Sequence, residues 1–114
     1  MIEFDEKTCI DEVKRYIKRL APKVAEKLKQ RGYNVSNINL HVAEGTVIVD
    51  KKLACAATNP ETNPVTQLYS CTCWEHFNEP SKIFTVAHEL VHAFGIKDEY
   101  IANTIALEVV REEK

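Results

Sequence analysis

The sequence predicts a single α+β domain that spans residues 1–114. Two observations carry this prediction: apolar residues recur at helical spacing near both ends of the chain, and they alternate with polar residues between. At 114 residues, the chain is long enough for one hydrophobic core and too short for two. The expected order is a leading helix, a small, mostly antiparallel sheet of three strands, and two further helices.

The leading helix is predicted to run from about Thr8 to Arg31. Its apolar residues form one stripe, made of Ile10, Val13, Ile17, Leu20, Val24 and Leu28. Thr8 can cap the start of the helix, and Gly32 can end it. Pro22 lies inside the segment and lacks a backbone N–H, so it is expected to kink the helix or to split it in two.

The first two strands are predicted to form a hairpin. Residues 38–42 alternate between apolar and polar side chains, and residues 46–49 follow after the dipeptide Glu44-Gly45. His41 falls in the polar phase of the first strand, which predicts a surface histidine.

A loop, a third strand and a helix follow the hairpin. Residues 58–64 contain Asn-Pro twice and predict a loop. Residues 65–74 are rich in β-branched and aromatic side chains, which predicts the third strand. A helix is expected to begin at Pro80 and to stop near Gly95.

The composition excludes some classes of protein. A net charge of -2 argues against a general nucleic-acid binder. No segment approaches the run of about 18 apolar residues that a membrane span needs, so stable membrane insertion is not expected. Residues 1–6 are acidic and lack the apolar core of a signal peptide, so the expected location is cytoplasmic. Nothing in the sequence predicts an oligomeric state.

Four cysteines are many for a cytoplasmic chain of this length. Cys71 and Cys73, followed by His76, could form half of a second zinc site, although the spacing of common zinc knuckles is absent. On a strand, Cys71 and Cys73 would point to the same face, so paired or buried thiols are the simpler interpretation. Cys55 could pair with either of them.

The strongest motif of the chain is His88-Glu89-Leu90-Val91-His92, inside the predicted helix that begins at Pro80. Residues four apart lie on the same face of a helix, so His88 and His92 can bind one metal ion. Glu89 lies about 100° further round the helix, where it can act as the general base for an attacking water molecule. The motif therefore predicts a Zn²⁺ site with hydrolytic chemistry.

A third metal ligand must come from further along the chain. Asp98 completes a His-Glu-x-x-His-x-x-Gly-x-x-Asp pattern in which Gly95 turns the chain back, and its other possible role is to cap the next helix. Glu99 lies on the first turn of that helix, and Glu108 lies much further along it. The helix is expected to reach about Arg111, with these residues inward: Ile101, Ala102, Ile105, Ala106 and Val109.

The histidine motif followed closely by Glu99-Tyr100-Ile101-Ala102-Asn103 resembles the minigluzincins, the abylysin/jannalysin-type minimal zinc metallopeptidases. The resemblance covers the whole chain in outline, and its motifs are specific within residues 87–106. It implies a zincin-like fold, one Zn²⁺ ion, Glu99 as the third ligand, and Asn103 as the residue that supports a ligand histidine. Metzincins carry a methionine-containing turn after the site, and the only methionine here is Met1.

The same resemblance implies a zinc metalloendopeptidase that hydrolyses peptide or protein substrates in its active form. A substrate would lie extended along an edge strand of the sheet, whose identity stays open. The alternative is a catalytically silent metal-binding module that holds a peptide or protein partner in its groove. A second donor to the substrate carbonyl is often a tyrosine or a histidine; Tyr69, His76 and Tyr100 are available, and the sequence favours none of them.

Members of that family are described as latent, which implies a chain segment that obstructs the cleft. Residues 1–6 and the tail at residues 112–114 are the candidate segments. Cys9 is a further candidate, because a thiolate is a good zinc ligand.

Overall fold

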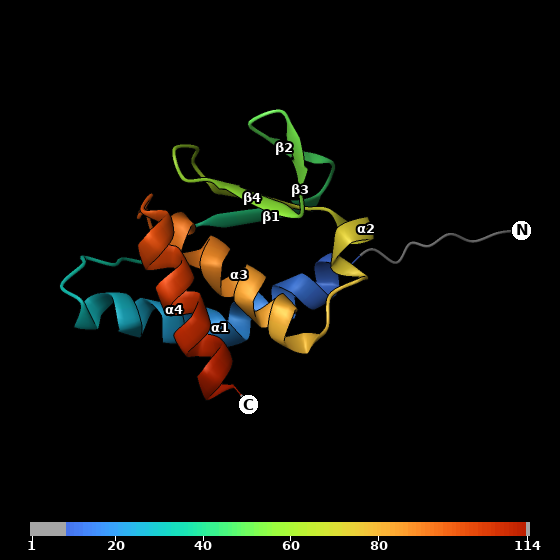
Figure 1. Ribbon diagram of the computed structural model, residues 1–114. Coiled ribbons are helices and arrows are strands. Elements are labelled where there is room, and N and C mark those ends of the chain that lie inside the picture. The colour runs from blue at the N-terminus through green and yellow to red at the C-terminus, as the bar shows by residue number, and fades with distance from the viewer. Residues whose placement is uncertain (1–8, 114) are drawn as a thin grey trace, which may run out of the picture.

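The computed structural model describes residues 9–113, and it confirms a mixed α+β domain. Three helices pack together on one side of a small sheet, and a short fourth helix follows the last strand (Figure 1). The helices are α1 (Ile10–Gln30), α2 (Cys71–Trp74), α3 (Glu79–Ala93) and α4 (Glu99–Glu112). The strands are β1 (Leu40–Glu44), β2 (Val47–Val49), β3 (Lys52–Ala54), β4 (Ala56–Asn59) and β5 (Val65–Tyr69).

The leading helix α1 is continuous across its proline. Pro22 lies on the exposed face of the helix, where water can solvate the carbonyl group that the missing N–H leaves unpaired, so the predicted split does not occur. The predicted end is confirmed, because Gly32 has a φ of 90° and its N–H donates to the carbonyl of Lys29. Thr8, the predicted cap, lies outside the described residues.

The sheet has three strands as predicted, but the predicted pairing is wrong. Its order is β1-β5-β4, in which β1 and β5 are parallel and β4 and β5 are antiparallel. The expected hairpin across Glu44-Gly45 does not form, because the edge of β1 pairs instead with a strand more than twenty residues away. A hairpin instead joins β2 to β3 through Asp50 and Lys51, which both adopt positive φ.

The third predicted strand is shorter than expected because α2 interrupts it. Ser70 caps α2 by accepting a hydrogen bond from the backbone N–H of Cys73. Cys71 and Cys73 therefore lie on a helix, and each is paired: Cys71 with Cys9, and Cys73 with Cys55. The two disulfides join α2 to the start of α1 and to the residue that precedes β4. The second pair is one of the two that the sequence suggested.

The hydrophobic core lies between the sheet and the three long helices. Tyr69 and Trp74 are buried at its centre, with their rings in an edge-to-face arrangement at 5.9 Å between centroids. The predicted inward face of α4 is confirmed for Ala102, Ile105, Ala106 and Val109. None of the described helices is long and apolar enough to cross a membrane.

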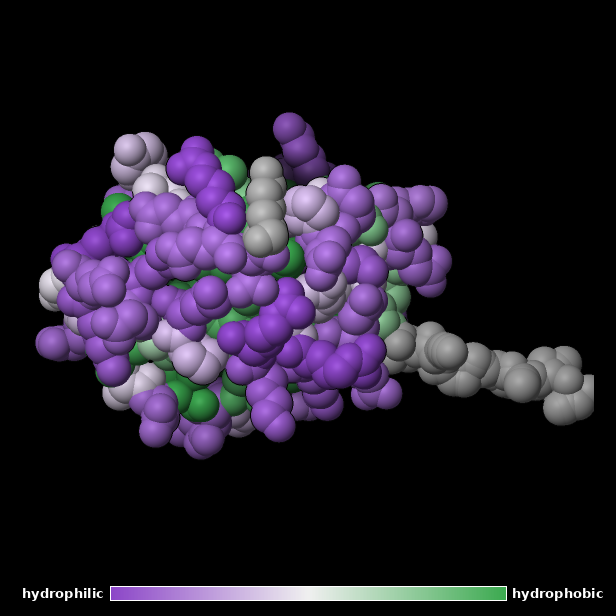
Figure 2. Space-filling view, turned by 90° about the horizontal axis from the view of Figure 1, so that it is seen from below, coloured by the Kyte–Doolittle hydropathy of each residue, from purple (hydrophilic) through white to green (hydrophobic). Residues whose placement is uncertain are grey.

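The outer face of the helical layer is largely hydrophilic (Figure 2). Basic side chains of α1 form ion pairs with acidic side chains at the end of α4 and just beyond it. Glu112 and Glu113 belong to these pairs, so this part of the tail is held against α1, at the opposite end of α4 from the predicted metal site. The other partners are Arg19, Lys23, Lys27, Arg31 and Glu108.

Candidate metal centre

The turn between α3 and α4 brings the predicted ligands together. Gly95 has a φ of 99°, a conformation that glycine adopts without strain, and it ends α3 just after His92. Asp98 caps α4 by accepting hydrogen bonds from the backbone N–H groups of Tyr100, at 2.8 Å, and of Ile101, at 3.3 Å. Glu99 is therefore the first residue of α4 and lies opposite the histidine face of α3.

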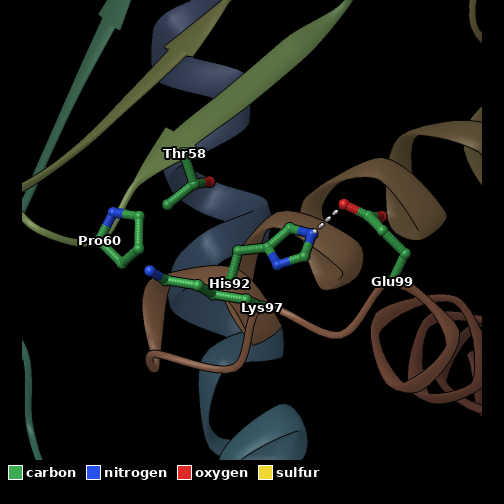
Figure 3. A pocket seen from close by; sticks show the side chains of 5 residues that line it. All are labelled: Thr58, Pro60, His92, Lys97 and Glu99. Carbon is green, nitrogen blue, oxygen red and sulfur yellow. Dashed lines mark ion pairs between the residues drawn. The ribbon is translucent and has the colours of Figure 1, made fainter. Parts of the chain in front are cut away.

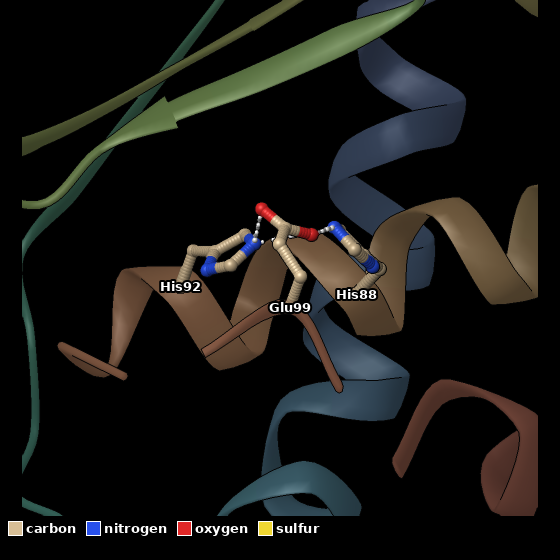
Figure 4. Close-up of side chains that lie close together, drawn as sticks. All are labelled: His88, His92 and Glu99. Carbon is tan, nitrogen blue, oxygen red and sulfur yellow. Dashed lines mark hydrogen bonds and ion pairs between the residues drawn. The ribbon is translucent and has the colours of Figure 1, made fainter. Parts of the chain in front are cut away.

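Three side chains meet at one point between the helices (Figure 4). The Nε2 atoms of His88 and His92 are 3.2 Å apart. One carboxylate oxygen of Glu99 lies 3.1 Å from His88 Nε2, and the other lies 3.2 Å from His92 Nε2. All three ligand atoms lie within 4.8 Å of one another, in the one group of possible metal ligands found among the described residues.

Hydrogen bonds on the far side of each imidazole ring determine where its proton lies. His88 Nδ1 is 2.9 Å from Oδ1 of Asn103, and His92 Nδ1 is 2.8 Å from the backbone carbonyl oxygen of Ile96. Both partners are acceptors, so both Nδ1 atoms carry a hydrogen and donate it. Each Nε2 atom therefore faces the carboxylate of Glu99, in the orientation that a histidine ligand of a metal ion needs.

The spacing of these atoms fits a zinc ion. Two imidazole nitrogens and one carboxylate oxygen are a common donor set for zinc in hydrolytic enzymes. Ligands that surround a tetrahedral zinc at about 2.0 to 2.1 Å lie roughly 3.3 Å from one another. The two Nε2 atoms are 3.2 Å apart, and each lies 3.1 to 3.2 Å from a different oxygen of Glu99, which is close to this value.

Glu89, the predicted general base, is 8% exposed and is held from the sheet side. Thr58 of β4 donates a hydrogen bond to its carboxylate oxygen Oε1 at 2.6 Å. Gln67 of β5, which is fully buried, donates to the backbone carbonyl oxygen of Glu89 at 3.1 Å. Tyr69 donates in turn to Oε1 of Gln67, and burial, together with the charge of Glu89, raises the pKa of Tyr69 well above 10.0.

A cavity of about 300 Å³ opens over the three ligands and along β4. Its walls are mostly apolar apart from the metal-site residues and Thr58, and the β2–β3 hairpin contributes to them. A neighbouring cavity of about 250 Å³ shares Thr58, His92 and Glu99 with it and extends toward Pro60 and Lys97 (Figure 3). The lining residues of the larger cavity outside the metal site are Val49, Ala54, Ala56, Ala57 and Thr58.

The three candidate third ligands lie in different places in the structure. The Asp98 carboxylate is engaged at the N-terminus of α4, and Glu99 approaches both histidines. Glu108 is paired with Arg31 and Lys27, which lowers its pKa through the hydrogen bond from Arg31, and it lies on the α1 side of α4. Of the three carboxylates, only that of Glu99 lies beside both histidines.

Several other predicted roles do not fit the structure. Tyr69 is fully buried and donates to Gln67, and neither His76 nor Tyr100 lines the cavities described above, so no second oxyanion donor is in place there. Cys9 is disulfide-bonded and so offers no thiolate to the metal. The half zinc site at Cys71, Cys73 and His76 is excluded because both of its cysteines are disulfide-bonded. His41 is exposed, as predicted, and residues 1–6 lie outside the described part of the chain.

Thr58 and Gln67 were not predicted as site residues. Gln67 could have been found, because it occupies the same inward phase of β5 as the buried residues Val65 and Tyr69, where a polar side chain needs a partner. Thr58 gives no such signal, since it precedes an Asn-Pro turn and its role depends on a pairing with β5 that is not local in sequence.

Comparisons with profiles of known protein families, with curated protein sequences and with solved structures found no match for this chain.

Proposed function

We propose that this protein is a zinc-dependent metallopeptidase of the gluzincin type with a zincin-like fold. The observation that carries the proposal is the meeting of Nε2 of His88, Nε2 of His92 and the carboxylate of Glu99 beside the buried carboxylate of Glu89. The contacts of both imidazoles with Asn103 and with the carbonyl of Ile96 support the proposal, because histidines that bind a metal usually donate their other ring N–H to such an acceptor.

The metal would be held by His88, His92 and Glu99, and when bound it would supply a Lewis acid that polarises a peptide carbonyl and activates water. The carboxylate of Glu89 takes a proton from the attacking water while the water oxygen bonds to the carbonyl carbon. The carbon–nitrogen bond then breaks, and Glu89 returns the proton to the departing amine. Asn103 and Ile96 keep both imidazoles in the tautomer that this arrangement requires.

The sheet supports a peptide substrate in extended conformation. Cys55 and Ser70 are opposite one another, and the N–H of Ser70 donates to the carbonyl of Cys55. Because bonded pairs alternate along an antiparallel ladder, Ala56 and Thr58 direct their backbone N–H and C=O groups to the free edge of β4. A peptide that pairs with this edge would lie along the cavity above the metal site.

The second candidate function is a catalytically silent metal-binding module that holds a peptide or protein in the same groove. The missing second oxyanion donor favours it, since the two described cavities offer no tyrosine and no third histidine to a developing negative charge. A latent peptidase would also lack a second oxyanion donor in these cavities. The described part of the tail is held at the opposite end of α4, so a segment that enforces latency would have to lie elsewhere.

The test is hydrolysis of a peptide library by zinc-loaded protein, with Glu89→Ala as the matched variant. We expect the wild-type protein to cleave peptides, either as the full chain or after removal of residues 1–6. The rate of hydrolysis should fall by roughly a hundredfold or more in the variant. The zinc content of the variant should be unchanged, because Glu89 is not a ligand. Metal binding without any turnover would favour the silent module, and undiminished turnover in Glu89→Ala would remove Glu89 from the mechanism.

A further inference from the structure

The hydroxyl group of Thr58 holds the carboxylate of Glu89 in one orientation. Its oxygen lies 2.6 Å from Oε1 of Glu89 and 3.3 Å from the backbone carbonyl oxygen of the same residue. A threonine hydroxyl has a single hydrogen to donate, and the charged acceptor at the shorter distance takes it. The bond is short for a neutral donor, as charge-assisted bonds are.

This hydrogen bond occupies one oxygen of Glu89 and leaves the other. Within residues 9–113, no other side chain is found to donate to that carboxylate or to form an ion pair with it. The Glu89 side chain lines the cavity together with both histidines and Glu99. The second oxygen is therefore the one available to a water molecule or ligand group in the cavity.

Thr58 and Gln67 hold different parts of Glu89. Thr58 and Gln67 are opposite one another in the β4–β5 ladder, so their side chains lie on the same face and both reach Glu89. Gln67 is bonded to the backbone carbonyl and fixes the helix, and Tyr69 orients the Gln67 amide. Thr58 alone fixes the carboxylate.

Thr58 also lies where a peptide would bind. Its side chain turns toward α3, and its backbone N–H and C=O groups face the free edge of β4. A peptide paired with that edge would form hydrogen bonds with the backbone of Thr58, while the hydroxyl of Thr58 donates to Glu89 on the other side of the strand.

We propose that Thr58 is a positioning residue for Glu89, through which the edge strand aims the general base at the metal site. The proposal rests on the proposed function, because Glu89 acts as a general base only if the protein is a peptidase. No sequence motif includes Thr58. The proposal assigns the hydroxyl of Thr58, and no other atom of that side chain, to the orientation of the Glu89 carboxylate.

The test measures ligand binding as well as turnover. The probe is a peptide hydroxamate, which binds zinc through two oxygens and donates a hydrogen bond to a neighbouring carboxylate. Its affinity for zinc-loaded protein is measured by calorimetry for wild type, Thr58→Val, Thr58→Ala and Thr58→Ser. Thr46→Val, at an exposed position outside the cavity, is the matched control.

We expect Thr58→Val and Thr58→Ala to weaken hydroxamate binding by roughly 10- to 100-fold, as loss of a hydrogen bond to a charged group would predict. Thr58→Ser, which keeps the hydroxyl, should stay within about threefold of wild type. Zinc stoichiometry should be unchanged in all variants. In a Glu89→Ala background, Thr58→Val should have no further effect, because the group that Thr58 holds is gone.

The outcomes separate the two proposals. If wild type hydrolyses no peptide but the hydroxamate affinities follow the expected order, the peptidase function fails and the positioning role stands. If wild type is active and Thr58→Val keeps both its kcat and its hydroxamate affinity, the positioning role is overturned and the function stands. Equal losses in Thr58→Ser and Thr58→Val would also overturn it, because the effect would then belong to packing. The use of Thr58→Ala covers the case in which valine perturbs the strand.

Discussion

Nδ1 of His88, on α3, donates a hydrogen bond to Oδ1 of Asn103, on α4, across 2.9 Å. The same helix α4 carries Glu99, whose carboxylate approaches the other ring nitrogen of His88 at 3.1 Å. Helix α4 thus carries both a candidate metal ligand, Glu99, and the hydrogen-bond partner of a second candidate ligand on α3, His88. The spacing between Glu99 and Asn103 is one helical turn, so the two side chains reach His88 from the same side of α4.

Replacement of Asn103 should weaken the metal site without removing a ligand. We expect Asn103→Ala to lower zinc affinity by roughly 10- to 100-fold, because His88 loses the acceptor that fixes its tautomer. Asn103→Asp keeps an acceptor oxygen and should lose less. Competition with a chelator measures the affinities, and the exposed Asn37→Ala serves as control. An Asn103→Ala variant that binds zinc as tightly as wild type would show that the hydrogen bond has no part in the site.

Reduction of the disulfides should destabilise the fold. The pairs Cys9–Cys71 and Cys55–Cys73 close loops with sequence separations of 62 and 18 residues. Chain entropy then predicts stabilisations of about 4 and about 3 kcal/mol. Urea unfolding of Cys9→Ser/Cys71→Ser and of Cys55→Ser/Cys73→Ser, each compared with wild type, measures the two losses.

The disulfides also bear on the predicted cytoplasmic location. Paired cysteines are typical of oxidising compartments and of the intracellular proteins of hyperthermophiles. Alkylation of free thiols at lysis, in protein from its native source that is unfolded without reductant, tests the pairing in that compartment. Mass spectrometry then counts the alkylated cysteines: four would contradict the pairing, and none would confirm it.

Glu12 should make the fold sensitive to acid. The indole N–H of Trp74 donates to its carboxylate at 2.7 Å and lowers the pKa of Glu12 below its usual 4.5, and Lys82 acts in the same direction. Because the folded-state pKa is depressed, the stabilisation is complete above pH 4.5 and is lost as the pH falls through the lower folded-state value.

The matching variant is Glu12→Gln, which can still accept from Trp74 and does not titrate. We expect its free energy of unfolding to change less than that of wild type between about pH 6 and pH 3. Urea unfolding at several pH values measures the difference. Parallel curves for the two proteins across this range would contradict the role given to Glu12.

The parts of the fold that depend on neighbouring residues were predictable from the sequence. The end of α3 at Gly95 and the start of α4 after Asp98 follow from backbone chemistry that acts within a few residues. The histidine spacing is equally local. These elements bring His88, His92 and Glu99 together, which is why the three could be identified from the sequence as candidate metal ligands.

The pairing of the strands was not predictable in the same way. β1 pairs with β5, which lies more than twenty residues further along the chain. Parallel strands are not joined by a tight turn, so no turn residues in the sequence indicate their pairing. Residues 71–74 have strand propensity, but the cap at Ser70 and the two disulfides favour a helical turn there. Thr58 reaches Glu89 only because β4 pairs with β5, so its place in the site depends on the part of the fold that sequence patterns describe least well.

The most direct test of the central claim is the position of a metal ion in a crystal of the zinc-loaded protein. We expect one anomalous peak at the zinc edge, within about 2.3 Å of His88 Nε2, His92 Nε2 and a carboxylate oxygen of Glu99. The peak should disappear in crystals of a His88→Ala/His92→Ala variant. A zinc-loaded wild-type crystal with no peak between these three side chains, or with its only peak elsewhere, would contradict the account.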